Sequence, residues 1–129
     1  MEINSSIARV DHSTEQLFSK LSSVETYKGL IPEGAAFTKI DTSRFRFKLD
    51  GMPEIGLTIG GKQPNKSIIL TSSSDKISFS LRGDLTKVSE TQSDVQLHFE
   101  GDFNPMMAMM VKKPLTQFME SLIGNMHKL

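Results

Sequence analysis

The sequence of 129 residues contains no cysteine, no tryptophan and a single tyrosine. Without cysteine the chain forms no disulfide, carries no thiolate nucleophile and cannot bind zinc or an iron–sulfur cluster through sulfur. A chain of this length buries roughly two-thirds of its unfolded surface, so it needs neither a disulfide nor a metal to fold. We therefore expect one domain over residues 1–129, held together by an apolar core.

The chain has no net charge either, because its 15 Lys and Arg residues balance its 15 Asp and Glu residues. Nucleic-acid binding depends on clustered basic side chains that face phosphates. Here charges of both signs alternate along the chain, so we predict no nucleic-acid partner. A net charge near zero also weakens repulsion between copies, which favours a weak homodimer.

Long apolar runs are missing too, since no stretch approaches the roughly 18 residues that a membrane-spanning helix needs. The first residues, Met1-Glu2-Ile3-Asn4-Ser5-Ser6, lack the basic and apolar regions of a signal peptide. We therefore expect a soluble, cytoplasmic protein with no membrane span.

The middle of the chain alternates apolar and polar residues with a period of two, which predicts strands with one buried face. The alternating apolar residues are Phe45, Phe47 and Leu49; Ile55, Leu57 and Ile59; Ile77, Phe79 and Leu81; and Val95, Leu97, Phe99 and Phe103. Turn residues separate these runs at positions 50–53, 60–65 and 73–75. With a first strand over residues 2–10, the pattern predicts an antiparallel sheet of about six to seven strands.

Helices are predicted on both sides of this run of strands. Ser13 followed by Gln16 is a capping-box pattern that begins a short helix, and a second short helix over 24–30 ends before Pro32. Asn104 and Pro105 are favoured residues for the N-cap and the first position of a long helix. Its apolar residues follow helical spacing at Val111, Leu115, Phe118, Met119, Leu122, Ile123 and Met126. The fold class is therefore α+β.

The order of these elements resembles the helix-grip fold of the START-like superfamily, also called SRPBCC. The stretch Ser13-Thr14-Glu15-Gln16-Leu17-Phe18 with Ile31-Pro32 is similar to that family's first-helix segment and its proline. Asn104-Pro105-Met106-Met107 and Lys113-Pro114-Leu115 are similar to the last helix of a small subgroup from Bacteroidetes-type bacteria. The resemblance covers nearly the whole chain and implies a curved sheet wrapped around the long C-terminal helix, with two short helices after the first strand.

That resemblance also implies a cavity between the sheet and the long helix, because many members bind an apolar or amphipathic small molecule there. We therefore expect non-catalytic binding of a hydrophobic or amphipathic molecule. The residues expected to line the cavity are Phe47, Ile59, Phe79, Phe99, Met107, Met110 and Phe118. The same aromatic residues would also serve as ordinary core in a strand protein of this size, and this alternative stays open.

Methionines 106, 107, 109 and 110 leave the beginning of the long helix with almost no polar face. Methionine is flexible and polarizable, so it suits surfaces that accept apolar groups of variable shape. This segment is expected to form either a lid over the pocket or a hydrophobic contact between copies. The second possibility makes the chain a protein-interaction or dimerisation module.

Residues for catalysis or metal binding are harder to find. His12, His98 and His127 are far apart in the sequence and have no metal-ligand spacing, and each is expected at the surface. We predict no catalytic residue, no metal and no cofactor, although the resemblance leaves a polyketide cyclase or aromatase as a further alternative. Gly83, in Arg82-Gly83-Asp84, is expected to mark a bulge or a turn.

Overall fold

The computed structural model describes residues 1–32, 34–49, 54–72 and 78–129. Strand β1 (Glu2–Val10) leads into helices α1 (Thr14–Leu21) and α2 (Val24–Leu30). Six strands follow: β2 (Ala36–Lys39), β3 (Arg44–Lys48), β4 (Ile55–Gln63), β5 (Ser67–Ser72), β6 (Phe79–Lys87) and β7 (Ser93–Gly101). Helix α3 (Pro105–Asn125) and a short 3₁₀ turn (Met126–Lys128) complete the described elements. The predicted α+β class and element order are confirmed.

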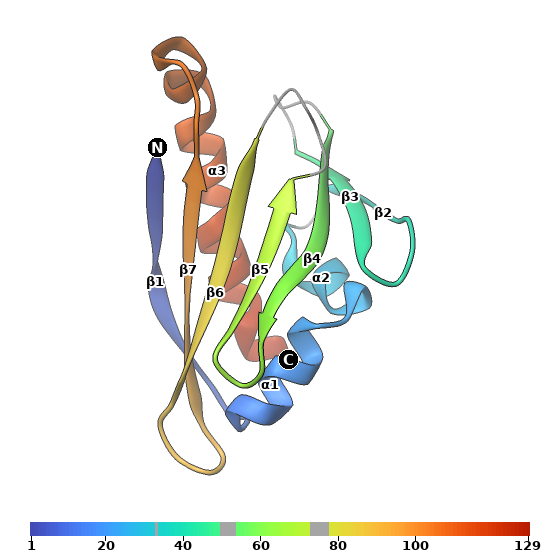
Figure 1. Ribbon diagram of the computed structural model, residues 1–129, viewed down its shortest axis with the longest axis vertical. Coiled ribbons are helices and arrows are strands. Elements are labelled where there is room, and N and C mark those ends of the chain that lie inside the picture. Colours follow the sequence, from blue (N-terminus) through green and yellow to red (C-terminus); the bar gives the residue numbers. More distant parts are fainter. Residues whose placement is uncertain (33, 50–53, 73–77) are drawn as a thin grey trace.

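The described strands form one antiparallel sheet of seven, in the order β1-β7-β6-β5-β4-β3-β2. All neighbours from β2 to β7 are consecutive in sequence, and β1 adds to the free side of β7. Helix α3 runs along one face of the sheet behind β1, β7 and β6, while α1 and α2 lie lower on the same face (Figure 1). The sheet and α3 therefore form two layers with the core between them.

Helix boundaries follow from local chemistry that the sequence made visible. The Ser13 hydroxyl accepts the Gln16 amide at 3.1 Å, and the Gln16 side chain accepts the Ser13 amide, so the predicted capping box is present. Asn104 caps α3 by accepting the Met107 amide at 2.8 Å, and Pro105 occupies the first helical position. Helix α2 ends at Leu30 because Ile31, which precedes Pro32, is extended.

Strand β1 contains an irregularity that alternation alone does not reveal. Ile3 and Val10 are both buried although they are an odd number of residues apart, and Ile7 is exposed. The register with β7 shifts between Asn4 and Ile7, which is a β-bulge at Ser5 and Ser6. The bulge reverses which side chains face the core, so both halves of β1 bury an apolar residue.

The turns predicted at 50–53 and 73–75, and the strand position of Ile77, lie outside the described residues. In the described ranges, no helix is long and apolar enough to cross a membrane.

Candidate functional site

The residues predicted to line a cavity are mostly in the core between the sheet and α3. Phe47 on β3, Ile59 on β4, Phe79 on β6, Phe99 on β7 and Phe118 on α3 are all buried. Met107 is half-buried and packs against this core, whereas Met110 is 69% exposed. Met110 therefore does not line the interior in this conformation.

These aromatic side chains divide into two clusters in the described part of the chain. The Phe47 and Phe118 rings lie 4.6 Å apart between centroids and join the sheet to α3. The Phe79 and Phe99 rings lie 4.8 Å apart, and Phe103 stacks on Phe99 at 6.1 Å. Both clusters are closely packed aromatic core, in arrangements typical of folded interiors.

A small apolar cavity lies between the sheet and the helices, and none of the phenylalanines of these two clusters lines it. Its volume is about 20 Å³, which is far below the roughly 300 Å³ at which pockets for drug-sized ligands begin. Nine residues line it: Leu21, Tyr27, Ile68, Leu70, Leu81, Gly83, Leu97, Leu122 and Met126. None of the seven residues predicted from the sequence is among them, because the space depends on how α1, α2 and α3 pack together over the sheet.

Gly83 leaves part of this space open. It pairs with Leu97 and Ile68 in regular ladders, so the bulge or turn expected at Gly83 is wrong. A Cβ atom built on Gly83 would lie 3.6 Å from the Leu97 Cδ2 atom and 3.9 Å from the Ile68 carbonyl oxygen, both ordinary contacts. An alanine would fit, so the glycine leaves unfilled space at an inward-facing position of a central strand.

Tyr27 is the one polar side chain among the residues that line the cavity. Its hydroxyl donates to the Leu21 carbonyl oxygen at 2.6 Å, and its ring stacks on Phe45 at 5.2 Å between centroids. Burial raises the pKa of the Tyr27 hydroxyl, so the group is neutral at physiological pH. Its oxygen keeps acceptor capacity for one further hydrogen bond.

A groove of about 240 Å³ lies between α3 and the residues that follow α2 and β3. Its walls are Pro32, Leu49, Pro114, Gln117, Phe118 and Ser121. Phe118 belongs to this wall and also to the core contact with Phe47, although only 5% of it is exposed. The Phe118 ring therefore separates the groove from the interior.

Comparison with solved structures finds the same architecture in proteins of low sequence identity. A START superfamily protein from Mycobacterium smegmatis gives a TM-score of 0.63 at 16% identity, over 97% of this chain and 96% of that one. A conserved protein from Geobacillus kaustophilus gives 0.68 at 12% identity, over 99% and 93%. The solution structure of the Aha1 dimer from Colwellia psychrerythraea gives 0.58 at 16% identity, over 95% and 96%.

This chain has the START-like fold. No family model matches it, and no curated protein matches it by sequence. The predicted helix-grip architecture is therefore confirmed, while the likeness extends to the fold alone.

In this START-like fold, the side-chain hydrogen bonds that attach α3 to the described residues lie on its β1 side and at its C-terminal end. The Ser6 amide and hydroxyl donate to the Glu120 carboxylate at 3.1 and 2.9 Å, which joins α3 to the bulge of β1. The Asn125 side chain donates to the Leu30 carbonyl at 3.0 Å, which joins the end of α3 to α2. Within the described residues, no side-chain hydrogen bond or ion pair joins α3 to β2–β6, the side on which Leu49 borders the groove.

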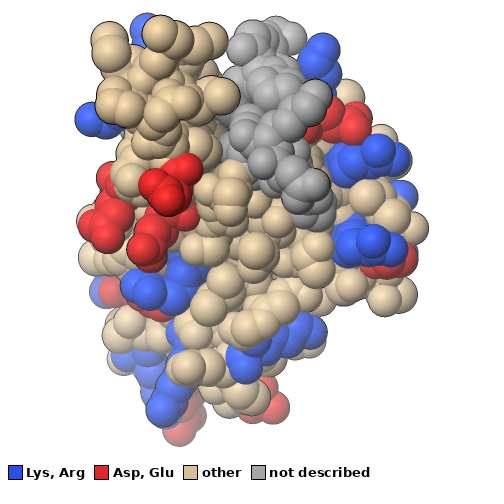
Figure 2. All heavy atoms as spheres, turned by 45° about the horizontal axis from the view of Figure 1, so that its top comes forward, with Lys and Arg blue, Asp and Glu red and all other residues tan. Residues whose placement is uncertain are grey.

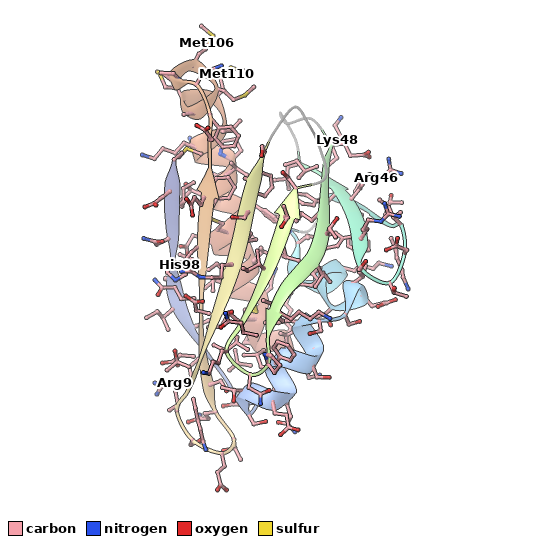
Figure 3. The ribbon with its side chains drawn as sticks, in the orientation of Figure 1. Arg9, Arg46, Lys48, His98, Met106 and Met110 are labelled. Atoms are coloured by element: carbon pink, nitrogen blue, oxygen red, sulfur yellow. The ribbon has the colours of Figure 1, made fainter. Side chains whose placement is uncertain are left out.

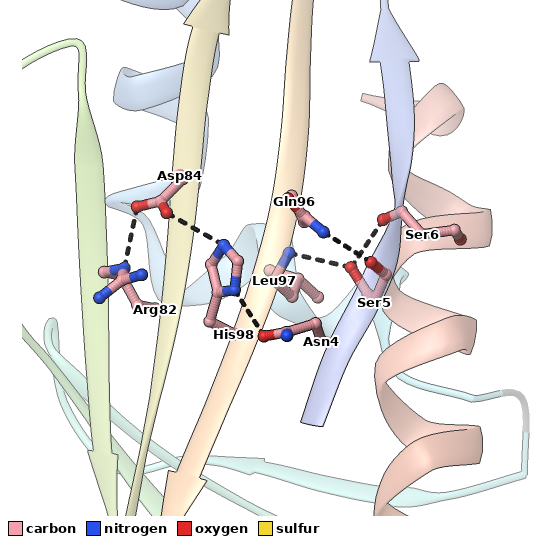
Figure 4. Close-up of polar contacts among 8 residues, drawn as sticks. All are labelled: Asn4, Ser5, Ser6, Arg82, Asp84, Gln96, Leu97 and His98. Carbon is pink, nitrogen blue, oxygen red and sulfur yellow. Dashed lines mark hydrogen bonds and ion pairs between the residues drawn. The ribbon is translucent and has the colours of Figure 1, made fainter. Parts of the chain in front are cut away.

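The outer face of the sheet carries a polar network around His98 (Figure 4). His98 Nε2 lies 3.1 Å from Asp84 Oδ2, and His98 Nδ1 lies 2.7 Å from Asn4 Oδ1. Arg82 donates to the other oxygen of Asp84 at 3.0 Å. Among the described residues, no group of three or more His, Asp and Glu side chains is placed to hold a metal ion.

The other two histidines make backbone contacts. His12 contacts the Leu129 carbonyl, and the His127 Nδ1 atom lies 2.7 Å from the Gly124 carbonyl. Neither His12, His98 nor His127 is among the residues that line the interior cavity.

Proposed function

We propose that this protein binds an apolar or amphipathic small molecule between the sheet and α3, without catalysis. The observation that carries the proposal is the apolar cavity beside Gly83, where a side chain would fit and none is present. Apolar burial contributes about 25 cal/mol per Å², so a site of this composition selects for size and apolarity more than for functional groups.

Binding requires the cavity to grow, because a volume of about 20 Å³ holds little more than one water molecule. We expect α3 to move away from the β3 side while its contacts to β1 and α2 hold. The Glu120–Ser6 hydrogen bonds support this direction, since they hold α3 on its β1 side, and the Asn125–Leu30 hydrogen bond holds the C-terminal end of α3. The groove beside Phe118 then becomes the route by which the molecule enters.

The proposed lining combines the cavity residues with the set predicted from the sequence. Phe47, Ile59, Phe79, Phe99 and Phe118 surround the same interior, and Met107 borders it. Met110 would join only when the beginning of α3 rotates inward. The Bacteroidetes-type subgroup and a cytoplasmic location remain predictions from the sequence.

Native mass spectrometry of the protein purified from its own cells, with organic extraction, tests the proposal. We expect one apolar molecule per chain. Gly83→Val should lose it, because the valine side chain fills the cavity. Gly60→Val is the matched control, since a Cβ at Gly60 on β4 meets nothing within 4 Å. Equal retention by both variants, or no carried molecule in the original chain, would contradict the proposal.

A second candidate function is a dimerisation module. Met106, Met109 and Met110 are all more than two-thirds exposed, and the Colwellia protein with this fold is described as a dimer. Sedimentation velocity would detect such a dimer as a concentration-dependent species that Met109→Ser abolishes. The cyclase or aromatase alternative has less support, because no carboxylate or imidazole is among the residues that line the cavity.

A further inference from the structure

The beginning of α3 forms an apolar tip that consists of Met106, Met109 and Met110. Their side chains are 74%, 84% and 69% exposed, so they are the most exposed large apolar side chains in the described residues. The first turns of α3 rise beyond the ends of the neighbouring strands (Figure 1). Met106 and Met110 lie at this end of the molecule, beyond the ends of β1 and β7 (Figure 3). Among the described residues, the tip is therefore a projection rather than part of a flat surface.

Two cations follow the tip on the same face of the helix. Lys112 and Lys113 are exposed, and they lie three and four residues after Met109, which is about one helical turn or 5 Å. Helical side chains lean toward the N-terminus, so both ammonium groups can extend back toward the methionines. No acidic residue occurs between Pro105 and Lys113. The beginning of α3 therefore carries an apolar tip followed, one helical turn later, by two lysines.

We infer that this tip docks on the surface of a lipid bilayer that contains anionic lipids. Apolar side chains of an interfacial helix enter roughly 5–10 Å into the boundary between headgroups and acyl chains. A lysine one turn behind the tip then lies at the level of the lipid phosphates, where it is attracted to negative charge. The spacing between the methionines and the lysines therefore matches the distance between the acyl-chain boundary and the lipid phosphates.

A second copy of the chain fits this tip less well. A stable protein interface uses roughly 20 to 30 residues from each partner, whereas the tip consists of three side chains at the end of one helix. A symmetric contact would also bring Lys112 and Lys113 close to the same residues of the other copy. A bilayer accepts a small convex projection without a matching groove, and its anionic headgroups complement the lysines.

Nearby carboxylates limit how the molecule meets the bilayer. Glu100 and Asp102 are exposed just before α3, and acidic atoms gather below the mostly tan projection in the space-filling view (Figure 2). Anionic headgroups repel these carboxylates, so the end of β7 that precedes α3 stays off the surface. Binding is therefore shallow, reversible and sensitive to salt.

Vesicle flotation with the full chain tests this inference. We expect the protein to float with vesicles of equal parts phosphatidylglycerol and phosphatidylcholine, and weakly with phosphatidylcholine alone. Replacing Met106, Met109 and Met110 together by serine should abolish binding. Lys112→Gln with Lys113→Gln should weaken binding to the mixed vesicles tenfold or more, since each lysine near an anionic surface contributes roughly fivefold.

The matched control combines Lys87→Gln with Val88→Ser in the β6–β7 hairpin, at the opposite end of the molecule (Figure 1). This variant removes one exposed cation and one exposed apolar residue and should bind vesicles like the original chain. Equal binding by the tip variants would overturn the inference. So would a lack of vesicle binding, with or without a dimer that depends on the methionines. Gly83→Val separates this inference from the proposed cavity, because docking through the tip predicts that this variant binds vesicles like the original chain.

Discussion

Gly83 shows how one residue can define a potential site. A glycine inside a strand costs about 0.5–1 kcal/mol relative to alanine, because its backbone loses more freedom on folding. Nothing in the ladders of β6 requires that cost, since Gly83 pairs regularly and a Cβ atom would make ordinary contacts. We interpret the missing side chain as space that the proposed ligand uses.

Tyr27 gives a prediction at the same scale. Its hydroxyl makes a buried hydrogen bond to the Leu21 carbonyl, and Tyr27→Phe would leave that carbonyl without this donor. We expect the free energy of unfolding to fall by about 1–3 kcal/mol, the cost of an unsatisfied buried group. Urea denaturation followed by circular dichroism measures this change. An unchanged midpoint would mean that another donor reaches the carbonyl.

At the scale of elements, the bulge in β1 determines how α3 is attached. The Ser5 hydroxyl accepts the buried Leu97 amide at 2.9 Å and donates to the Ser6 carbonyl at 2.7 Å (Figure 4). It replaces a ladder hydrogen bond that the bulge has removed. Ser6, the next residue, then presents its amide and hydroxyl to Glu120 on α3. The irregular strand therefore anchors one side of the long helix.

Ser5→Ala tests the role of this bulge. The substitution leaves the Leu97 amide unsatisfied, so we expect a loss of about 1–3 kcal/mol of unfolding free energy. We also expect faster hydrogen exchange of the Leu97 and Ser6 amides. Thr38→Ala, on the exposed surface of β2, is a control that should change neither quantity. Unaltered exchange at Leu97 in Ser5→Ala would show that the hydroxyl is not its partner.

Local patterns explain which features could be predicted from the sequence. The caps at Ser13 and Asn104 and the end of α2 before Pro32 depend on a few neighbouring residues, so they are visible in the sequence. The bulge leaves a weaker signal, the odd separation of Ile3 and Val10. The cavity leaves almost none, because its nine lining residues come from α1, α2, β5, β6, β7, α3 and the 3₁₀ turn that follows α3.

The residues predicted to line a cavity also show that tertiary packing is not visible in the sequence. Alternation correctly placed Phe47, Phe79 and Phe99 on the inner face of the sheet. It could not show that their rings pack against other aromatic side chains, because that depends on the distance between sheet and helix. Helical spacing likewise could not show that Met110 faces solvent, since nothing polar marks the exposed side of α3 near its beginning.

In the molecule as a whole, two sets of methionines lie in different places and have separate proposed roles. Met119 and Met126 are buried between α3 and the sheet, and Met126 lines the cavity. Met106, Met109 and Met110 form the exposed tip. A ligand in the interior and a surface contact at the tip therefore affect different methyl groups.

Nuclear magnetic resonance of methionine-methyl-labelled protein, titrated with decanoate as a monomeric amphiphile, reports directly on binding between the sheet and α3. We expect saturable shifts of the Met119 and Met126 methyl resonances, which Gly83→Val should abolish and Gly60→Val should preserve. Shifts confined to Met106, Met109 and Met110, or no shifts at all, would contradict binding between the sheet and α3.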